Sequence, residues 1–113
     1  VVSDQIGSPT YAGELAAVIW TILATNRFAP GVYHWTDDGG ISWHEFAEAI
    51  QAEAVSRGLL SRSIPVHAIA SSEYPTPAAR PAYSVLDTTK LESLLEINAR
   101  PWKEQLEVML DAL

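Results

Sequence analysis

The stretch Tyr74-Pro-Thr-Pro-Ala-Ala-Arg-Pro-Ala-Tyr-Ser-Val-Leu-Asp87 restricts the backbone of this 113-residue chain more than any other. Its three prolines fix φ, remove backbone donors and push the residue before each of them toward an extended conformation. The stretch therefore predicts a stiff, extended loop and not a helix or a central strand. It also places Arg80 between Tyr74 and Tyr83. One guanidinium between two phenols is an arrangement that can hold an anion beside a ring-shaped ligand.

Upstream of this loop, apolar residues recur at intervals of three and four and predict a helix over about 11–26. Thr10 or Ser8 is the expected N-cap, because a side-chain oxygen there accepts from an otherwise unpaired amide. The apolar stripe expected to be buried consists of Leu15, Val18, Ile19, Ile22 and Leu23.

The sequence Ser42-Trp43-His44-Glu45 matches the S-x-x-E capping box, in which serine and glutamate satisfy each other's backbone amides. We expect a second helix from this box to about Arg57, with Gly58 as its C′ residue. A short helix from Thr88 or Thr89 to Leu95 and a last helix that opens at Pro101 follow.

Short strands are expected at Val1-Val2, at 31–35 and at 65–69, where β-branched and aromatic residues concentrate. The predicted fold class is therefore mixed α+β, with three main helices, one short helix and a few short strands. No linker or internal repeat divides the chain, so residues 1–113 are predicted to form a single domain. The start inside an apolar pair resembles a cut through a strand, and we expect a fragment.

Composition excludes several classes of protein. Fourteen acidic and seven basic residues give a net charge of −7, and no cluster of basic residues exists, so we expect neither nucleic acid nor membrane as a partner. The chain has no cysteine, which excludes disulfides and thiolate metal sites and agrees with a cytoplasmic protein.

Catalytic and cofactor motifs are not found in the sequence. The glycines do not form G-x-G-x-x-G, and no tyrosine is followed four residues later by lysine, the pair that short-chain reductases use. The histidines His34, His44 and His67 fall in separate predicted elements, which argues against a metal site. We therefore predict no catalytic residue, no metal site and no cofactor site in this chain alone.

Three features allow two interpretations. Asp37-Asp38 is either an acid/base pair or, more often for acids before Gly-Gly, a solvated turn. Trp35 and Trp43 are either an apolar wall for a sugar or a base, or core residues, and core packing is favoured. Arg80 either binds a diphosphate or pairs with a nearby acidic side chain, and composition does not separate these alternatives.

Several stretches in order resemble one protein family: Val1–Thr10, Gly31–His34, Ser42–Ala47, Tyr74–Asp87 and Arg100–Trp102. Together they are similar to the C-terminal part of dTDP-4-dehydrorhamnose reductases, which are extended short-chain dehydrogenases/reductases. The resemblance implies that residues 1–113 form a single small C-terminal substrate-binding lobe, without the N-terminal Rossmann domain that binds NADPH. It also implies a dTDP-sugar as ligand and dTDP-L-rhamnose synthesis as the pathway.

The resemblance places Arg80, Tyr74 and Tyr83 near the nucleotide diphosphate, and Gln5 and Thr10 near the sugar. Ala79 departs from many relatives, which carry a second arginine there, and this difference predicts weaker anion binding. The first hypothesis is a reductase fragment that binds substrate and is not catalytic alone. The second is a non-catalytic binding or regulatory module, and the third is an unrelated interaction domain. A homodimer or a separate Rossmann half is the expected protein partner.

Overall fold

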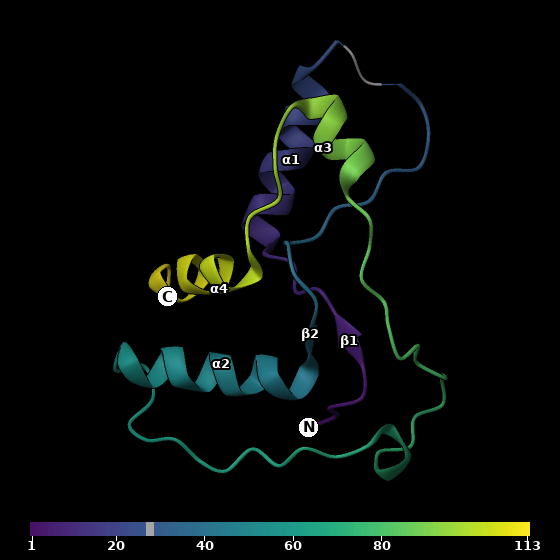
Figure 1. Ribbon diagram of the computed structural model, residues 1–113. Coiled ribbons are helices and arrows are strands. Elements are labelled where there is room, and N and C mark those ends of the chain that lie inside the picture. The colour runs from purple at the N-terminus through teal and green to yellow at the C-terminus, as the bar shows by residue number, and fades with distance from the viewer. Residues whose placement is uncertain (27–28) are drawn as a thin grey trace. The chain divides into compact units, whose positions relative to one another are not determined.

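The computed structural model describes residues 1–26 and 29–113 (Figure 1). In chain order, their elements are β1 (Ile6–Gly7), α1 (Ala12–Ala24), β2 (Ile41–Ser42), α2 (Trp43–Ser56), the 3₁₀-helix η1 (Ser71–Glu73), α3 (Thr89–Leu95) and α4 (Trp102–Asp111). The mixed α+β class is confirmed at the level of four α-helices and one two-stranded antiparallel sheet within the described residues. All four helices occur where the sequence predicts them.

These residues form two compact units. The first unit contains residues 1–7, 40–85 and 113, and the second contains 8–39 and 86–112. The first unit therefore holds the β1–β2 sheet, α2 and residues 74–85, which we call the proline loop, whereas the second holds α1, α3 and α4.

In the first unit, backbone pairing joins three segments that are far apart in sequence. Ile6 of β1 lies opposite Ser42 of β2 in antiparallel register, and its other edge forms a parallel bridge to Tyr83. The Ile6 amide donates to the Ala82 carbonyl at 2.8 Å, and the Ser84 amide donates to the Ile6 carbonyl at 2.8 Å. Ile6 thus connects the N-terminal segment, the start of α2 and the proline loop.

The strand predictions were wrong in detail. Residues 1–2 and 65–69 meet only in an isolated parallel bridge between Val2 and Ile69, and 31–35 forms no strand. Strand propensity alone does not produce a strand when no neighbouring backbone lies alongside to complete the ladder. Conversely, β1 forms at Ile6–Gly7, where the sequence analysis names no strand, because Ile6 has backbone partners on both sides.

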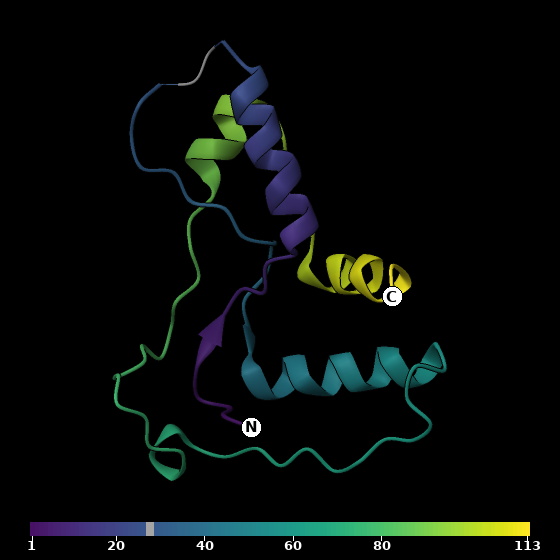
Figure 2. The ribbon, with the colours of Figure 1, turned by 180° about the vertical axis from the view of Figure 1, so that it is seen from behind.

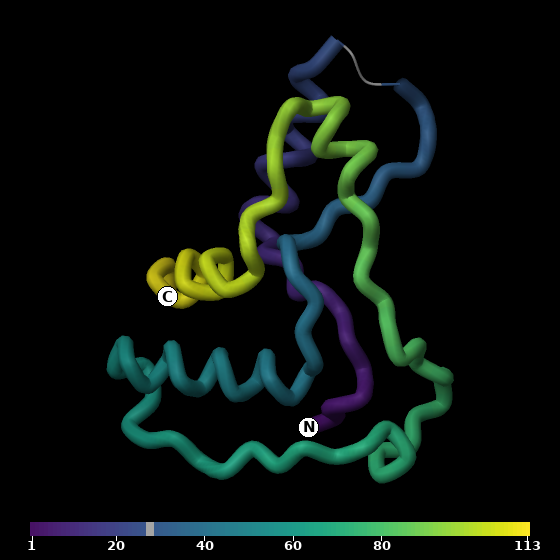
Figure 3. The backbone as a smooth tube through the Cα atoms, in the orientation of Figure 1, coloured from purple at the N-terminus to yellow at the C-terminus, as the bar shows by residue number. Residues whose placement is uncertain are grey.

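The capping box at the start of α2 is confirmed. The Ser42 hydroxyl accepts from the Glu45 amide at 3.1 Å, and the Glu45 carboxylate accepts from the Ser42 amide at 3.2 Å. At the other end, Gly58 has φ +71°, the left-handed conformation expected of a C′ glycine. The chain then returns along α2 (Figure 3). The Gln51 side chain bonds both backbone groups of Ile64 in this returning segment.

The predicted N-cap of α1 was wrong. Tyr11 occupies the N-cap position without a side-chain cap, and the Asp37 carboxylate accepts from the Tyr11 amide at 2.9 Å. Thr10 is unavailable for capping because its hydroxyl shares a hydrogen bond with the Thr36 hydroxyl at 2.9 Å. A loop distant in sequence therefore satisfies this helix end.

Figures 1 and 2 show α3 alongside α1 in the second unit, and the core of this unit lies there. Val18, Trp35 and Leu91 are its buried centre, which confirms the core interpretation of Trp35. The apolar stripe of α1 is only partly buried, because Ile19 and Leu23 are 49% and 70% exposed. The stripe is wider than the face that packs into this core. No α-helix in 1–26 or 29–113 is long and apolar enough to span a membrane.

The capping box provides a test of local stability. Ser42→Ala removes the hydroxyl that accepts from the Glu45 amide, and we expect the free energy of unfolding to fall by about 1 kcal/mol. Urea denaturation followed by circular dichroism measures the loss. Ser61→Ala, at an exposed position, is the matched control. Equal urea midpoints for the two variants would contradict the assigned role of Ser42.

Candidate functional site

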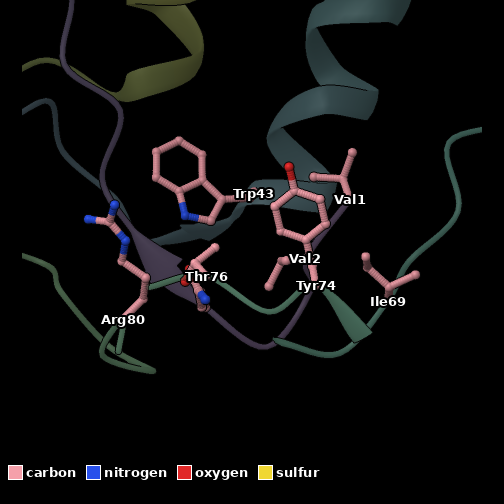
Figure 4. A pocket seen from close by; sticks show the side chains of 8 residues that line it. Val1, Val2, Trp43, Ile69, Tyr74, Thr76 and Arg80 are labelled. Carbon is pink, nitrogen blue, oxygen red and sulfur yellow. The ribbon is translucent and has the colours of Figure 1, made fainter. Parts of the chain in front are cut away.

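The first unit contains a cavity of about 540 Å³ (Figure 4). Its walls come from the N-terminal segment, the first residue of α2, Ile69 and the proline loop. The lining residues are Val1, Val2, Gln5, Trp43, Ile69, Tyr74, Thr76 and Arg80. Protein pockets for small ligands have volumes of roughly 300–1,000 Å³, so this cavity has the size of a ligand site.

The apolar part of the cavity depends on the pairing of two segments. The Ile69 amide donates to the Val1 carbonyl at 3.0 Å, and the Ser3 amide donates to the Ile69 carbonyl at 2.9 Å. These bonds hold the side chains of Val1, Val2 and Ile69 at one wall. The sequence analysis missed this wall, since the only signal was a pair of short apolar segments with no indication that they pair.

Two aromatic rings line the same cavity. Trp43 is 51% exposed and Tyr74 is 64% exposed, and Figure 4 shows Trp43 between Arg80 and Tyr74 in that view. The core interpretation was wrong for Trp43, because it is the first residue of α2 and its buried neighbour Ser42 forms the cap instead. Exposed aromatic faces stack on planar rings and on the apolar faces of sugars.

Arg80 is an exposed cation at this cavity. Across 1–26 and 29–113 it forms no hydrogen bond or ion pair with any residue, so the alternative of a local acidic partner is wrong. By contrast, Arg57 is paired with the Glu53 carboxylate at 2.5 Å. All of the guanidinium donors of Arg80 are thus available to an anion.

A polar group on the cavity wall is held by a second residue. The Gln5 amide nitrogen Nε2 donates to the Ser71 hydroxyl at 2.9 Å, and that hydroxyl donates to Asp4 Oδ1 at 2.6 Å. The Ser71 backbone amide also donates to Asp4, with both oxygens at 3.0 Å. These hydrogen bonds, first from the Ser71 hydroxyl and then from its amide, hold the pKa of Asp4 below its ordinary value.

Of the five residues predicted to contact a substrate, three line the cavity: Arg80, Tyr74 and Gln5. Tyr83 is 68% exposed, bridges Ile6 through its backbone and is not among the lining residues. Thr10 belongs to the second unit, where its hydroxyl is bonded to Thr36. The contacts of all five residues with a ligand stay predictions.

The Asp37-Asp38 pair is not a solvated turn. Asp37 is only 3% exposed, and this burial raises the pKa of its carboxyl, an effect that the hydrogen bond from the Tyr11 amide opposes. Asp38 is exposed, and its backbone forms a bridge to Pro101. The next residue, Gly39, has φ +101°, and a Cβ there would lie 3.0 Å from the Trp102 ring. Asp37 is therefore bonded to a helix end in the second unit.

The histidines do not converge with acidic side chains as metal ligands do. In the part of the chain that the structure describes, no three His, Cys, Asp or Glu side chains group around a common point. His44 places its ring nitrogen Nε2 2.7 Å from the Val66 carbonyl, which gives the ring a structural role.

The whole chain, residues 1–113, matches the sequence model of one protein family, described as the RmlD substrate binding domain. It is 40% identical over 111 residues to dTDP-4-dehydrorhamnose reductase of Aggregatibacter actinomycetemcomitans, with 95% of this chain and 38% of that protein aligned. It is also 40% identical over 111 residues to the Bacillus subtilis spore coat polysaccharide biosynthesis protein SpsK, with 97% and 35% aligned.

Solved structures agree with this result. The chain resembles dTDP-4-dehydrorhamnose reductase of Bacillus anthracis, crystallised in complex with NADP, with a TM-score of 0.83 and 33% identity. The similarity covers 99% of this chain and 36% of that one. The chain thus spans a little over a third of the length of the relatives that it matches.

The burial of Asp37 leads to a prediction about pH. Since burial raises the pKa of this carboxyl in the folded state, its contribution to stability is full below the ordinary value of 3.8 and is lost as pH rises through the folded-state pKa. Asp37→Asn keeps an oxygen for the Tyr11 amide but does not titrate. We expect the free energy of unfolding of the unaltered chain, relative to Asp37→Asn, to fall between acidic and neutral pH.

Urea denaturation at several pH values measures this difference. Asp38→Asn is the matched control, because the Asp38 side chain is exposed. If the free energy of unfolding of the unaltered chain, relative to that of Asp37→Asn, stays constant or rises with pH, the raised pKa of Asp37 is ruled out.

Proposed function

The chain belongs to the RmlD substrate binding domain family, and from this membership we propose that its cavity binds a dTDP-linked sugar. The observation that supports the proposal best is the position of Arg80, a guanidinium without a protein partner among the described residues, beside two exposed aromatic rings. A nucleotide sugar offers the matching groups, namely a diphosphate, a planar base and a sugar ring.

In the proposed complex Arg80 binds the diphosphate through charge-assisted hydrogen bonds. Trp43 and Tyr74 contact the base or the sugar, and the aliphatic wall excludes water from part of the ligand. The proposed contacts of Tyr83 and Thr10 with the ligand rest on family resemblance alone. The proposed ligand carries negative charge, and an acidic chain with net charge −7 gains affinity for it only where a cation is placed locally.

We further propose that the parent protein reduces the 4-keto group of this sugar with NADPH in dTDP-L-rhamnose synthesis. Residues 1–113 would serve as one substrate-binding lobe of that enzyme. The lobe would not be catalytic alone, because its sequence has neither G-x-G-x-x-G nor the Tyr-x-x-x-Lys pair. The alternative is a non-catalytic binding or regulatory module built on the same lobe. Reduction of the substrate after a Rossmann half is supplied would favour the reductase.

The role of Arg80 is tested by isothermal titration of dTDP into the 113-residue chain. Arg80→Ala removes the charged donor group, and we expect the affinity for dTDP to fall by about tenfold or more. Arg62→Ala is the matched control, since Arg62 is also exposed but does not line the cavity. Equal affinity of both variants would remove Arg80 from the proposed site.

The expected homodimer has a physical basis in apolar side chains that the described residues leave exposed. On α1, Ile19, Trp20 and Leu23 are 49%, 72% and 70% exposed, and burial of such surface favours association. Sedimentation velocity of the purified chain should show a dimer at tens of micromolar. A single monomeric species at that concentration would contradict the prediction.

A further inference from the structure

Three residues of the first unit form a chain of hydrogen bonds that ends at the cavity. Asp4 accepts from both the hydroxyl and the amide of Ser71, and the same hydroxyl accepts from Nε2 of Gln5. Gln5 lines the cavity, whereas Asp4 and Ser71 do not. The chain therefore links two supporting residues to one residue that a ligand can reach.

The direction of each bond follows from the chemistry of Asp4. A carboxylate only accepts hydrogen bonds, and the lowered pKa of Asp4 keeps it ionised at neutral pH. The single hydroxyl proton of Ser71 is thus committed to Asp4 Oδ1, at 2.6 Å. The lone pairs that remain on this hydroxyl can only accept, and the Gln5 side chain must turn its NH₂ group toward them.

This arrangement determines which end of the Gln5 amide is available. With Nε2 bonded to Ser71, the carbonyl oxygen Oε1 has no hydrogen-bond partner in the described part of the chain. Without Asp4, the Ser71 hydroxyl could donate as well as accept, and the amide could turn around. Asp4 and Ser71 thereby remove one of the two orientations that a glutamine amide can adopt.

We propose that Asp4 and Ser71 are positioning residues that orient Gln5 so that its Oε1 accepts a hydrogen bond from an N–H or O–H group of the ligand. This inference rests on the proposed function. It goes beyond that function because it names the kind of ligand group that Gln5 recognises and the two residues that orient the Gln5 side chain. In a dTDP-sugar the groups that can donate are the ring N–H of thymine and the sugar hydroxyls.

The decisive variant is Asp4→Ala, which removes the acceptor of the Ser71 hydroxyl proton. The Ser71 hydroxyl is then free to donate to Gln5 Oε1, and the NH₂ group of Gln5 can turn toward the ligand. Isothermal titration of a dTDP-hexose into the 113-residue chain should show affinity reduced by about three- to tenfold. Asp38→Ala is the matched control, because it removes an exposed carboxylate outside the first unit.

A double-mutant comparison separates positioning from a structural role. Gln5→Ala and Ser71→Ala should each weaken binding, and the double variant should bind as Gln5→Ala does, because Ser71 acts through Gln5. Ser71→Thr restores the hydroxyl and should restore the affinity. Thermal unfolding checks that the variants are folded. Independent losses that multiply in the double variant, or an Asp4→Ala chain that binds as tightly as the unaltered one, would overturn the proposal.

The source of the donor is identified with a modified ligand. If thymine supplies it, dTDP methylated at the ring nitrogen N3 binds the unaltered chain more weakly than dTDP, and Gln5→Ala binds both ligands equally. If the sugar supplies it, Gln5→Ala weakens the dTDP-hexose but leaves dTDP unaffected. Either result supports the proposal, and a Gln5→Ala chain that behaves like the unaltered chain with every ligand overturns it.

Failure of this inference is distinguishable from failure of the proposed function. If the unaltered chain binds neither dTDP nor the dTDP-hexose, both proposals fall. If Arg80→Ala weakens binding whereas the variants at Asp4 and Ser71 do not, only the positioning role is rejected.

Discussion

The backbone pairing of Ile6 with two partners at once is the constraint on which the candidate site depends. Ile6 lies opposite Ser42 of β2 on one side, and on the other side both of its backbone groups are bonded to the proline loop, at Ala82 and Ser84. A segment with a partner on each edge leaves no unpaired backbone group on either side, so its position is strongly specified. Through it, the loop that carries Arg80 and the helix that begins at Trp43 lie within one compact unit.

The proline loop places Arg80 at the cavity. The prolines reduce the conformational freedom that the loop loses on folding, which lowers the entropic cost of holding Arg80 at a fixed place. The loop is not held by its own hydrogen-bond ladder, since only the Tyr83 region joins a bridge. This stiff loop keeps a cation exposed and without an acidic partner among the described residues, in a chain where acidic residues outnumber basic ones by fourteen to seven.

Sequence reasoning predicted best the features that depend on neighbouring residues. The capping box at Ser42 and Glu45 and the C′ glycine at Gly58 involve groups a few residues apart, so pattern and chemistry alone located both ends of α2. It failed where a partner comes from elsewhere in the chain. The N-cap of α1 was assigned to a local hydroxyl, whereas Asp37, 26 residues away, bonds the Tyr11 amide. The same limit explains why 31–35 was predicted as a strand.

The sequence by itself determined the helices, the mixed fold class and the family, and it indicated Arg80 as a candidate anion-binding residue, because each of these follows from local periodicity, composition or an ordered set of motifs. Only the tertiary structure decided which residues share the cavity and that Trp43 is exposed and Trp35 buried. It also decided that Gln5 is hydrogen-bonded to Ser71, and Ser71 to Asp4. The physical reason is that these outcomes depend on hydrogen bonds and packing between residues as many as 67 positions apart. Spacing along the chain carries no information about such contacts.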